Sequence, residues 1–287
     1  MQTPLISIIT STYNCVGTLN DTANSILNQT YTNLEYIIID GNSTDSTVDL
    51  IKSFEENFKA KEIKFSWVSE SDKGIYDAWN KGIKIANGDW IVFIGGDDYF
   101  KNNNTLDETV PFLNQHRKSN CNFFYGKIEH VNKIGDLVEI SGKPWKNQKE
   151  KFENMMNIGH SGSFHHKTLF SKHGNFDSSF QIAGDYEFLL REFKNQTNNA
   201  YFVSNIIIVM REGGISATLK NRLVLIKESR KARKLNGITN FSKELFFWEL
   251  KVRVILIIKF FFGNNFASTM ADLYRKIFLG KQKRWNV

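Results

Sequence analysis

Short apolar runs alternate with segments of helical spacing through the first hundred residues. The runs predict buried strands at residues 5–9, 34–39, 64–68 and 90–94. Between them, apolar residues recur every three or four positions, which predicts helices over residues 18–28, 44–58 and 75–86. Strands that alternate with helices in this way are typical of a mostly parallel sheet flanked by helices, so the predicted fold class is α/β.

Capping signals give the expected helix ends. Ser43 or Thr44 can cap the second helix, and Asn87-Gly88 predicts a left-handed end for the third. Beyond residue 100 the pattern is less regular. It predicts a helix near 106–116, a strand at 122–126, a hairpin across 132–136, an irregular loop over 142–160, a helix that begins near 183 and a strand at 201–210.

Carboxylates follow three of the predicted strands. Asp40 follows the second strand, Asp72 the third, and the pair Asp97-Asp98 follows the fourth after two glycines. Parallel sheets bind ligands beyond the carboxyl ends of their strands, so these acids are expected at one edge. Adjacent aspartates repel each other unless a hard divalent cation with its phosphates joins them. A solvated turn is the alternative for the pair alone, but three acidic strand ends favour an active or nucleotide site.

The charge of the chain is divided unevenly. Residues 219–287 hold 16 Lys and Arg against 4 Asp and Glu, which leaves residues 1–218 with 21 basic and 26 acidic side chains, a net charge of −5. An acidic body argues against nucleic acid as the main substrate, whereas a basic, aromatic tail suits an anionic surface. Two cysteines indicate neither a disulfide framework nor a zinc site, and the first residues lack a signal-peptide pattern, so a cytoplasmic location is expected.

The tail is apolar without being long enough to span a membrane. Its longest uninterrupted apolar run is 254–258, far below the roughly 20 residues that a spanning helix needs. Aromatic residues mixed with Lys and Arg over 241–262 predict an amphipathic helix at a membrane interface, helped by basic clusters at 227–234 and 281–284. The alternative is a helical extension that packs on the body or on a second subunit.

Six sequence blocks resemble, in order, those of the family 2 glycosyltransferases, and within that family the branch that builds bacterial surface polysaccharides, including the colanic acid transferases. The blocks lie at 6–14, 37–47, 69–82, 88–98, 184–191 and 213–216. The resemblance implies a type A glycosyltransferase fold with a Rossmann-like sheet. It implies a catalytic domain over 1–218, divided into a nucleotide-binding half (1–100) and an acceptor-binding half (101–218), followed by the basic helical tail (219–287).

The resemblance also assigns roles on the donor side. Ser11 and Tyr13 would bind the nucleotide, with Tyr13 stacked on the base; Asp40 would accept a hydrogen bond from the base. Asp72 would lie near base and ribose. Asp97 would reach the ribose or the metal, and Asp98 would be the principal ligand of Mg²⁺ or Mn²⁺. Many relatives carry a further acid where this chain has Gly96. Tyr13 as an ordinary loop aromatic is the alternative.

On the acceptor side, the attacking hydroxyl must lose a proton, which calls for a carboxylate. Asp185 occupies the base position of the family and opens a predicted helix, whose dipole is expected to stabilise the ionised form. Helix capping is the alternative role for Asp185, and Glu187 is a second candidate base that should face away from it. His160 matches a histidine of the family that would contact acceptor or phosphate, with a structural histidine as the alternative.

These features together predict an inverting, metal-dependent glycosyltransferase at the inner face of the plasma membrane. It would move a sugar from a nucleotide diphosphate, with uridine diphosphate favoured by the family, to a glycan or lipid-linked acceptor. Two other classes stay open at this stage. A sugar nucleotidyltransferase should carry a glycine-rich basic loop after the first strand, which 11–15 does not provide. A non-catalytic sugar- or nucleotide-binding protein is disfavoured by Asp98 and Asp185.

Overall fold

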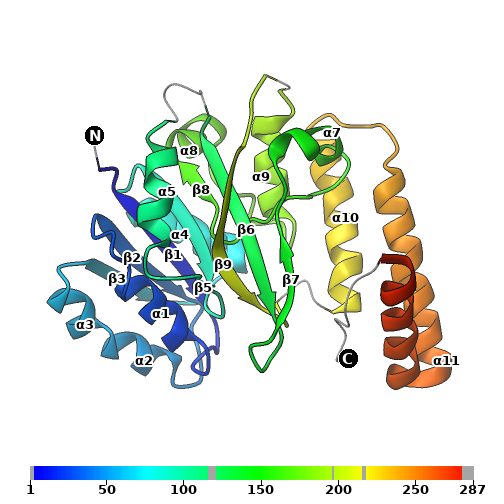
Figure 1. Cartoon of the computed structure of the whole chain (residues 1–287), viewed down its shortest axis with the longest axis horizontal. Coiled ribbons are helices and arrows are strands. Elements are labelled where there is room, and N and C mark those ends of the chain that lie inside the picture. Colours follow the sequence, from blue (N-terminus) through cyan, green and yellow to red (C-terminus); the bar gives the residue numbers. More distant parts are fainter. Residues whose placement is uncertain (1–2, 116–120, 196, 215–217, 280–287) are drawn as a thin grey trace.

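The structure, a computed structural model, describes residues 3–115, 121–195, 197–214 and 218–279. Within them the fold is α/β, and one nine-stranded sheet runs through the body (Figure 1). The strands are β1 (Ile6–Thr12), β2 (Leu34–Asp40), β3 (Lys64–Ser69), β4 (Trp90–Gly95), β5 (Tyr99–Phe100), β6 (Phe123–Val131), β7 (Leu137–Ser141), β8 (Phe164–His166) and β9 (Tyr201–Arg211).

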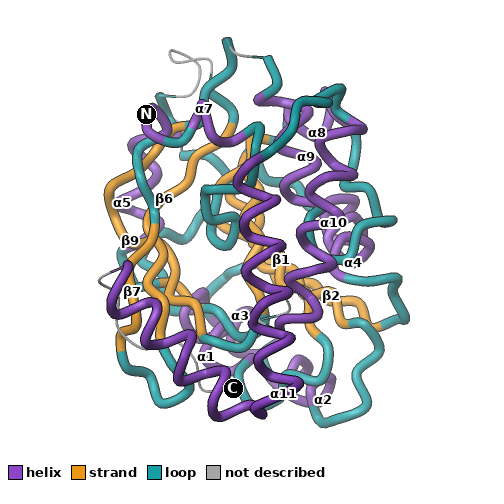
Figure 2. The backbone as a smooth tube through the Cα atoms, turned by 90° about the vertical axis from the view of Figure 1, so that its right-hand side faces the viewer, coloured by secondary structure: helices purple, strands orange, loops and turns teal. Residues whose placement is uncertain are grey.

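Helices flank this sheet and continue beyond it. The helices are α1 (Leu19–Leu27), α2 (Thr47–Ser53), α3 (Glu55–Ala60), α4 (Ile75–Ile85), α5 (Thr105–Leu113), the 3₁₀ turn η1 (Trp145–Asn147), α7 (Lys149–Phe152), α8 (Thr168–His173), α9 (Gly184–Phe193), α10 (Leu219–Leu235) and α11 (Lys243–Leu279). In the tube view, turned by 90°, α10 and α11 lie toward the viewer, in front of the strands (Figure 2).

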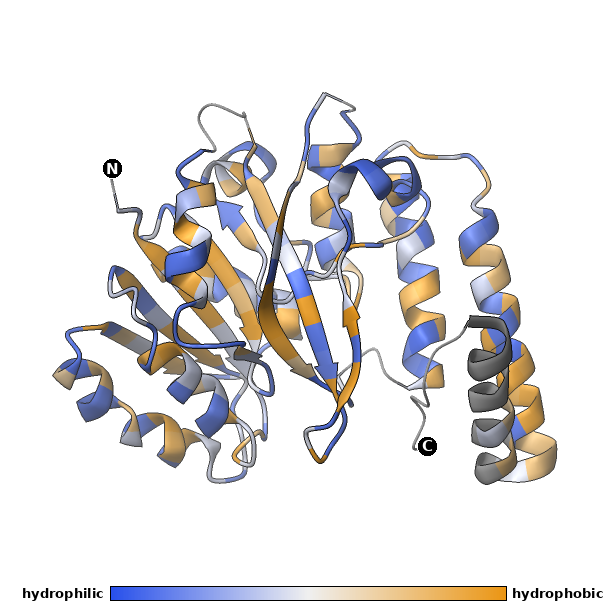
Figure 3. Ribbon diagram, viewed as in Figure 1, coloured by the Kyte–Doolittle hydropathy of each residue, from blue (hydrophilic) through white to orange (hydrophobic). Residues whose placement is uncertain are grey.

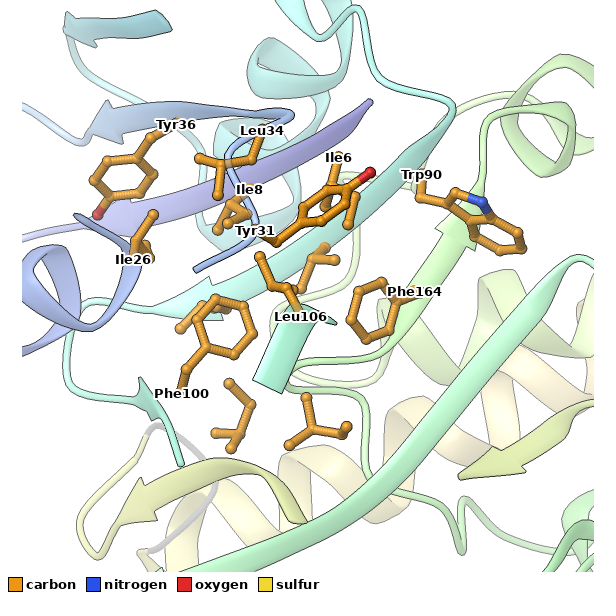
Figure 4. Packing of buried hydrophobic residues seen from close by; sticks show 14 of the residues in the cluster. Ile6, Ile8, Ile26, Tyr31, Leu34, Tyr36, Trp90, Phe100, Leu106 and Phe164 are labelled. Atoms are coloured by element: carbon orange, nitrogen blue, oxygen red, sulfur yellow. The ribbon is translucent and has the colours of Figure 1, made fainter. Parts of the chain in front are cut away.

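The first four strands form a parallel half-sheet in the order β3-β2-β1-β4. Their side chains alternate between two apolar layers, because successive residues of a strand point to opposite faces. Ile8 and Tyr36 pack in one layer, and Ile9 and Ile37 in the other. Figure 4 shows the first layer closing around Tyr31 and further core residues. The parallel pairing brings the carboxyl ends of β1, β2 and β4 to one edge of the sheet.

The second half of the sheet is mixed. β8 pairs antiparallel with both β4 and β6, and thus joins the two halves. β9 runs parallel to β6, while the short strand β5 pairs antiparallel with β9. The hairpin predicted across 132–136 is present and joins β6 to β7. The described strands beyond residue 100 therefore extend the sheet of the first hundred residues rather than forming a separate one.

The last two helices stand beside the body. α10 packs on α9, and α11 packs on α10 through Ile226, Leu245 and Val252 (Figure 1). α11 turns back on itself at Gly263, whose φ of 80° is the left-handed conformation that glycine adopts without strain. In the described part of the chain, every helix is too short or too polar to cross a membrane.

Three local predictions need correction. The helix expected over 44–58 is divided into α2 and α3 and begins only at Thr47, where the Asp45 carboxylate accepts a hydrogen bond from the Thr47 amide. Gly88 does not end α4 in a left-handed turn; it is close-packed instead, since a Cβ there would lie 2.5 Å from Ser7 Oγ. The segment 142–160 contains η1 and α7 rather than only loop. Residues 116, 215–217 and 280–287 of the predicted elements lie outside the described residues.

Candidate active site

The carboxylate of Asp40, at the end of β2, is fully buried and saturated with hydrogen bonds. It accepts from the Thr12 hydroxyl (2.9 Å), from the amide (2.9 Å) and hydroxyl of Ser43, and from the Ser69 hydroxyl (2.7 Å). These donors outweigh desolvation and lower the pKa of Asp40. A carboxylate offers about four acceptor positions, so a nucleobase could bind Asp40 only by displacing one of these donors.

Of the other predicted nucleotide residues, Asp72 lies against the end of β2, next to Asp40. A Cβ on Gly41 would lie 2.7 Å from Asp72 Oδ2, so only glycine lets Asp72 approach the end of β2 this closely. Ser11, at the end of β1, is half-buried, and Tyr13 just beyond it is 65% exposed. This exposure fits both a ring that stacks on a base and the alternative of an ordinary loop aromatic. Stacking of Tyr13 on a base stays a prediction.

The aspartate pair after β4 has the opposite electrostatics to Asp40. The Asp98 side chain is 4% exposed and accepts a hydrogen bond of 2.7 Å from Ser161. Burial first, and then the charge of Asp97, raise the pKa of Asp98 to about 7. Burial also raises the pKa of Asp97. Both carboxyl groups are therefore costly to ionise until a positive charge joins them.

Gly96 precedes this pair in a crowded position. A Cβ at Gly96 would lie 2.9 Å from Cys15 Sγ and 3.4 Å from Thr12. The Thr18 hydroxyl donates to the Gly96 carbonyl (2.8 Å), which fixes the turn from the other side. The acid that many relatives carry at this place would thus collide with Cys15. The present packing therefore leaves room only for glycine before the Asp-Asp pair.

Arg211, at the end of β9, closes the same turn. Its guanidinium donates to the carbonyl of Asp97 (2.9 Å), forms an ion pair with Asp21, and lies 4.8 Å from the ring centre of Tyr99. The positive charge lowers the pKa of both aspartates against the effect of burial. Sequence reasoning missed Arg211 because the strand that carries it is 114 residues from Asp97.

Asp185 lies in the first turn of α9, close to Tyr76 of α4. The Tyr76 hydroxyl lies 2.7 Å from the carbonyl of Ile182 and 3.2 Å from Asp185 Oδ1, and its single proton can serve either oxygen. The aromatic ring of Tyr76 also explains Gly184: a Cβ there would lie 2.7 Å from the ring. A residue larger than glycine at position 184 does not fit beside this tyrosine.

The expected electrostatic effect of the helix on Asp185 is not the dominant one. Desolvation raises the pKa of Asp185 to about 6, although the Tyr186 amide donates to the carboxylate. The cost of burial therefore exceeds the benefit of the helix dipole, and Asp185 is a stronger base than a solvated aspartate. Glu187 faces elsewhere, as predicted, and pairs with Arg191.

A continuous set of contacts joins the two ends of the site. Ser161, which binds Asp98, follows His160, whose ring stacks on Trp79 at 5.0 Å. Trp79 in turn packs against Tyr76 at 5.3 Å, and Tyr76 reaches Asp185. The acid pair and the candidate base are thus connected through two adjacent residues of one loop and two of α4.

His160 itself is buried and neutral. Burial lowers its pKa to about 3, so its imidazole brings no positive charge to a phosphate. Its Nε2 atom has no hydrogen-bond partner in the part of the chain that the structure describes. The stacking on Trp79 supports a structural role for His160. Contact of His160 with an acceptor or phosphate stays a prediction.

Comparison with known proteins identifies the class. Over 225 residues the chain is 28% identical to a PGL/p-HBAD biosynthesis glycosyltransferase of Mycobacterium bovis, covering 77% of this chain and 83% of the relative. It is 30% identical over 189 residues to an uncharacterized glycosyltransferase of Mycobacterium tuberculosis, covering 66% and 68%. The chain is a glycosyltransferase. It belongs to glycosyl transferase family 2, whose sequence model matches residues 7–173.

Solved structures confirm the predicted type A fold. S. aureus TarS 1-349 in complex with UDP-GlcNAc superposes with a TM-score of 0.61 at 16% identity, covering 94% of this chain and 77% of TarS 1-349. The mannosyltransferase PcManGT from Pyrobaculum calidifontis, in complex with GDP-Man and Mn²⁺, gives a TM-score of 0.62 at 14% identity, covering 96% and 76%. At these identities the likeness concerns the fold.

Proposed function

We propose that the chain is an inverting, metal-dependent glycosyltransferase. It moves a sugar from a nucleotide diphosphate, preferably uridine diphosphate, to a glycan or lipid-linked acceptor in bacterial surface polysaccharide synthesis. The observation that carries this proposal is the contact path from Asp98 through Ser161, His160, Trp79 and Tyr76 to Asp185. It links Asp97 and Asp98, two carboxylates that are costly to ionise, to Asp185, a carboxylate whose basicity is raised. The UDP-GlcNAc and GDP-Man complexes of the structural neighbours support a nucleotide-sugar donor.

The residues at the end of β4 fit a hard divalent cation. Asp97 and Asp98 offer carboxylate oxygens, the ligands that Mg²⁺ and Mn²⁺ prefer, and the raised pKa values of both side chains would be relieved by positive charge. Among the described residues, no group of three or more His, Cys, Asp or Glu side chains could hold a metal alone, so donor phosphates would complete the ligand set. When bound, the cation would stabilise the charge that develops on the leaving diphosphate. The Mn²⁺ in the PcManGT complex is in keeping with this role.

Asp185 serves as the general base in this proposal. The acceptor hydroxyl attacks the sugar carbon and transfers its proton to the Asp185 carboxylate. The new oxygen–carbon bond forms as the bond from that carbon to the diphosphate oxygen breaks, so the configuration at the carbon inverts. The raised pKa of Asp185 strengthens it as a proton acceptor and still leaves it mostly ionised at neutral pH.

A donor panel tests the proposal directly. The protein is heated with uridine, guanosine and thymidine diphosphate sugars, each with and without Mn²⁺, and the melting temperature is recorded. A true donor should raise it only in the presence of the metal, since ligand binding stabilises the native state. Release of nucleoside diphosphate from that donor is then measured. The absence of metal-dependent stabilisation with every donor would contradict the proposal.

The same proposal places α11 on an anionic membrane at the cytoplasmic side. One face of α11 packs on α10, while Phe247, Ile257, Phe260 and Phe261 of the same helix are 57–83% exposed. Orange bands mark apolar residues along the coloured part of α11 (Figure 3). Packing on the body and contact with a membrane are thus compatible, because they use different faces. Lys251 and Arg253 add positive charge beside the apolar residues, which suits acidic lipid headgroups.

Vesicle binding of the full-length chain tests this surface. Phe260→Ser combined with Phe261→Ser should reduce co-sedimentation with phosphatidylglycerol vesicles several-fold, as bulky aromatics are lost from the interface. Ile134→Ser is the matched control, because Ile134 at the tip of the β6–β7 hairpin is as exposed as Phe260, at 83% each. Equal binding by all three proteins would exclude α11 as the membrane contact.

A further inference from the structure

Glu228 of α10 holds the segment that leads into the candidate base. Its Oε1 atom accepts from the amide of Gln181 (2.7 Å), and its Oε2 atom accepts from the amides of Ile182 (2.8 Å) and Ala183 (2.9 Å). The side chain is 9% exposed, so these three bonds are shielded from water. One carboxylate thus satisfies three consecutive backbone donors that would otherwise be unpaired at the start of α9.

This segment sets the position of Asp185 in two ways. Ala183 is the N-cap of α9, and its carbonyl accepts the first helical hydrogen bond, from the Glu187 amide (3.0 Å). The carbonyl of Ile182 also accepts from the Tyr76 hydroxyl, which lies within 3.2 Å of Asp185. A shift of residues 181–183 would therefore move both the start of the helix and the tyrosine partner of Asp185.

The composition of α10 makes Glu228 exceptional within the helix. Residues 219–235 contain seven Lys and Arg and a single acid, which is Glu228. A neighbouring cation reaches the same segment: Lys231 donates to the Ser179 hydroxyl (2.7 Å) and lies 4.0 Å from the centre of the Phe180 ring. An entirely basic face would leave the amides of 181–183 without an acceptor. The lone carboxylate is placed where those donors are.

We propose that Glu228 is a positioning residue for the base Asp185: its carboxylate fixes residues 181–183 and thereby the first turn of α9. The proposal rests on the proposed role of Asp185 in transfer, and it assigns part of the catalytic apparatus to the basic C-terminal region. Among the described residues, the ionisable groups with the largest influence on Asp185 from neighbouring elements are Tyr76 of α4 and Glu228 of α10. The charge of Glu228 contributes to the raised pKa of Asp185.

Hydrogen exchange and enzyme kinetics with the full-length chain test this role. Glu228→Gln should speed hydrogen exchange of the amides of residues 181–183 by about tenfold or more, because the charged acceptor is lost. Turnover of the donor selected by thermal stabilisation should fall, with the dissociation constant for its nucleoside diphosphate and Mn²⁺ unchanged. The acid limb of the kcat profile should move to lower pH, because removing the negative charge of Glu228 lowers the pKa of Asp185.

Two variants serve as controls. Glu228→Asp keeps the charge and should hold the acid limb near its wild-type position while restoring part of kcat. Glu249→Gln removes a carboxylate of α11 that pairs with Arg230 and Arg253, and it should change neither measurement. A folded Glu228→Gln protein with wild-type exchange in 181–183 and an unmoved acid limb would overturn the proposal. Failure of the proposed function is distinguishable, since Asp185→Asn would then retain full turnover while the exchange experiment still reported the contact.

Discussion

Asp40 and Asp98 hold equivalent places in the sheet but opposite electrostatic positions. Asp40 is the last residue of the buried parallel strand β2, Asp98 lies just beyond the buried parallel strand β4, and each is at most 4% exposed. Four protein donors surround Asp40 and lower its pKa, whereas Asp98 accepts one side-chain hydrogen bond, lies beside Asp97 and has its pKa raised to about 7. The protein alone stabilises Asp40 as an anion. Ionisation of Asp98, by contrast, is unfavourable relative to a solvated aspartate.

We propose that this difference separates a carboxylate that mainly maintains the fold, Asp40, from one that is suited to a ligand, Asp98. A buried anion that is already paired gains little from a cation, while an unpaired one gains much. Burial alone therefore does not reveal a ligand site; the number of donors around the carboxylate does. The following changes are ordered by the size of the effect that this comparison predicts.

Removal of Asp98 should have the largest effect. Asp98→Ala should lower donor turnover by about 10³-fold, because stabilisation of the leaving diphosphate by a cation is worth several kcal/mol. Metal-dependent thermal stabilisation by the donor should disappear. Asp89→Ala, at the opposite end of β4 and paired with Lys167 on the surface, is the control and should retain activity. Full turnover by Asp98→Ala would remove the basis of the comparison.

Removal of the proposed base should cause the second-largest loss of turnover. Asp185→Asn should lower kcat by at least about 10²-fold with unchanged nucleotide affinity, since the amide cannot accept the proton of the hydroxyl. In the wild-type enzyme kcat should decline as pH falls below about 6, where Asp185 becomes protonated. Steady-state rates between pH 5 and 8 measure this limb. A pH-independent rate in this range would place the base elsewhere.

Substitution of Asp40, unlike that of Asp98 or Asp185, should mainly lower the free energy of unfolding. Asp40→Asn should lower the free energy of unfolding by about 1–3 kcal/mol at pH 7, because two charge-assisted acceptor positions are lost. The native pKa of Asp40 is lowered, so its stabilising effect is complete above its ordinary pKa and is lost as the pH falls through the native value. Urea unfolding is compared at pH 7 and at a pH well below 3.8, the ordinary pKa of aspartate. The variant should approach the wild type in stability only at the lower pH. Loss of nucleotide binding without loss of stability would instead favour base recognition by Asp40.

The smallest effect is expected from removing single hydroxyl groups that donate hydrogen bonds to the two carboxylates. Ser161→Ala should weaken the apparent affinity for Mn²⁺ and nucleoside diphosphate by about tenfold, because the hydroxyl that orients Asp98 is lost. Ser69→Ala removes one of four donors to Asp40 and should leave this affinity unchanged. Titration calorimetry compares the two. Equal losses in both variants would erase the distinction between the strand ends.

The sequence was sufficient to predict the parallel half of the fold. Its strands are continuous apolar runs, and acids stand at or after the strand ends. Period and position therefore predicted the two layers, and also the sheet edge at which Asp40, Asp72 and Asp98 are expected. The sequence did not predict the contacts that segments distant along the chain make with the site. Tyr76 and Glu228 approach Asp185 from 109 residues upstream and 43 residues downstream, and local pattern carries no signal for such pairs.

Distant contacts also decide the ionisation energy of Asp185, which the sequence therefore could not predict. The position of Asp185 at a helix start predicted stabilisation of its anion, but desolvation dominates once Tyr76 and α10 cover the turn. The predicted boundary at residue 218 likewise falls just before α10, which contacts the base segment through Glu228. Composition distinguished the basic region but not which of its helices belongs with the body.

The close packing of Gly184 against Tyr76 has an evolutionary consequence. A Cβ at position 184 and an aromatic ring at position 76 cannot occupy the space that the two residues now share. A lineage that acquires an acid or alanine beside Asp185 must first give up or displace the tyrosine, and a lineage that regains the tyrosine must return to glycine. The two positions should therefore covary, and the order of such substitutions is constrained.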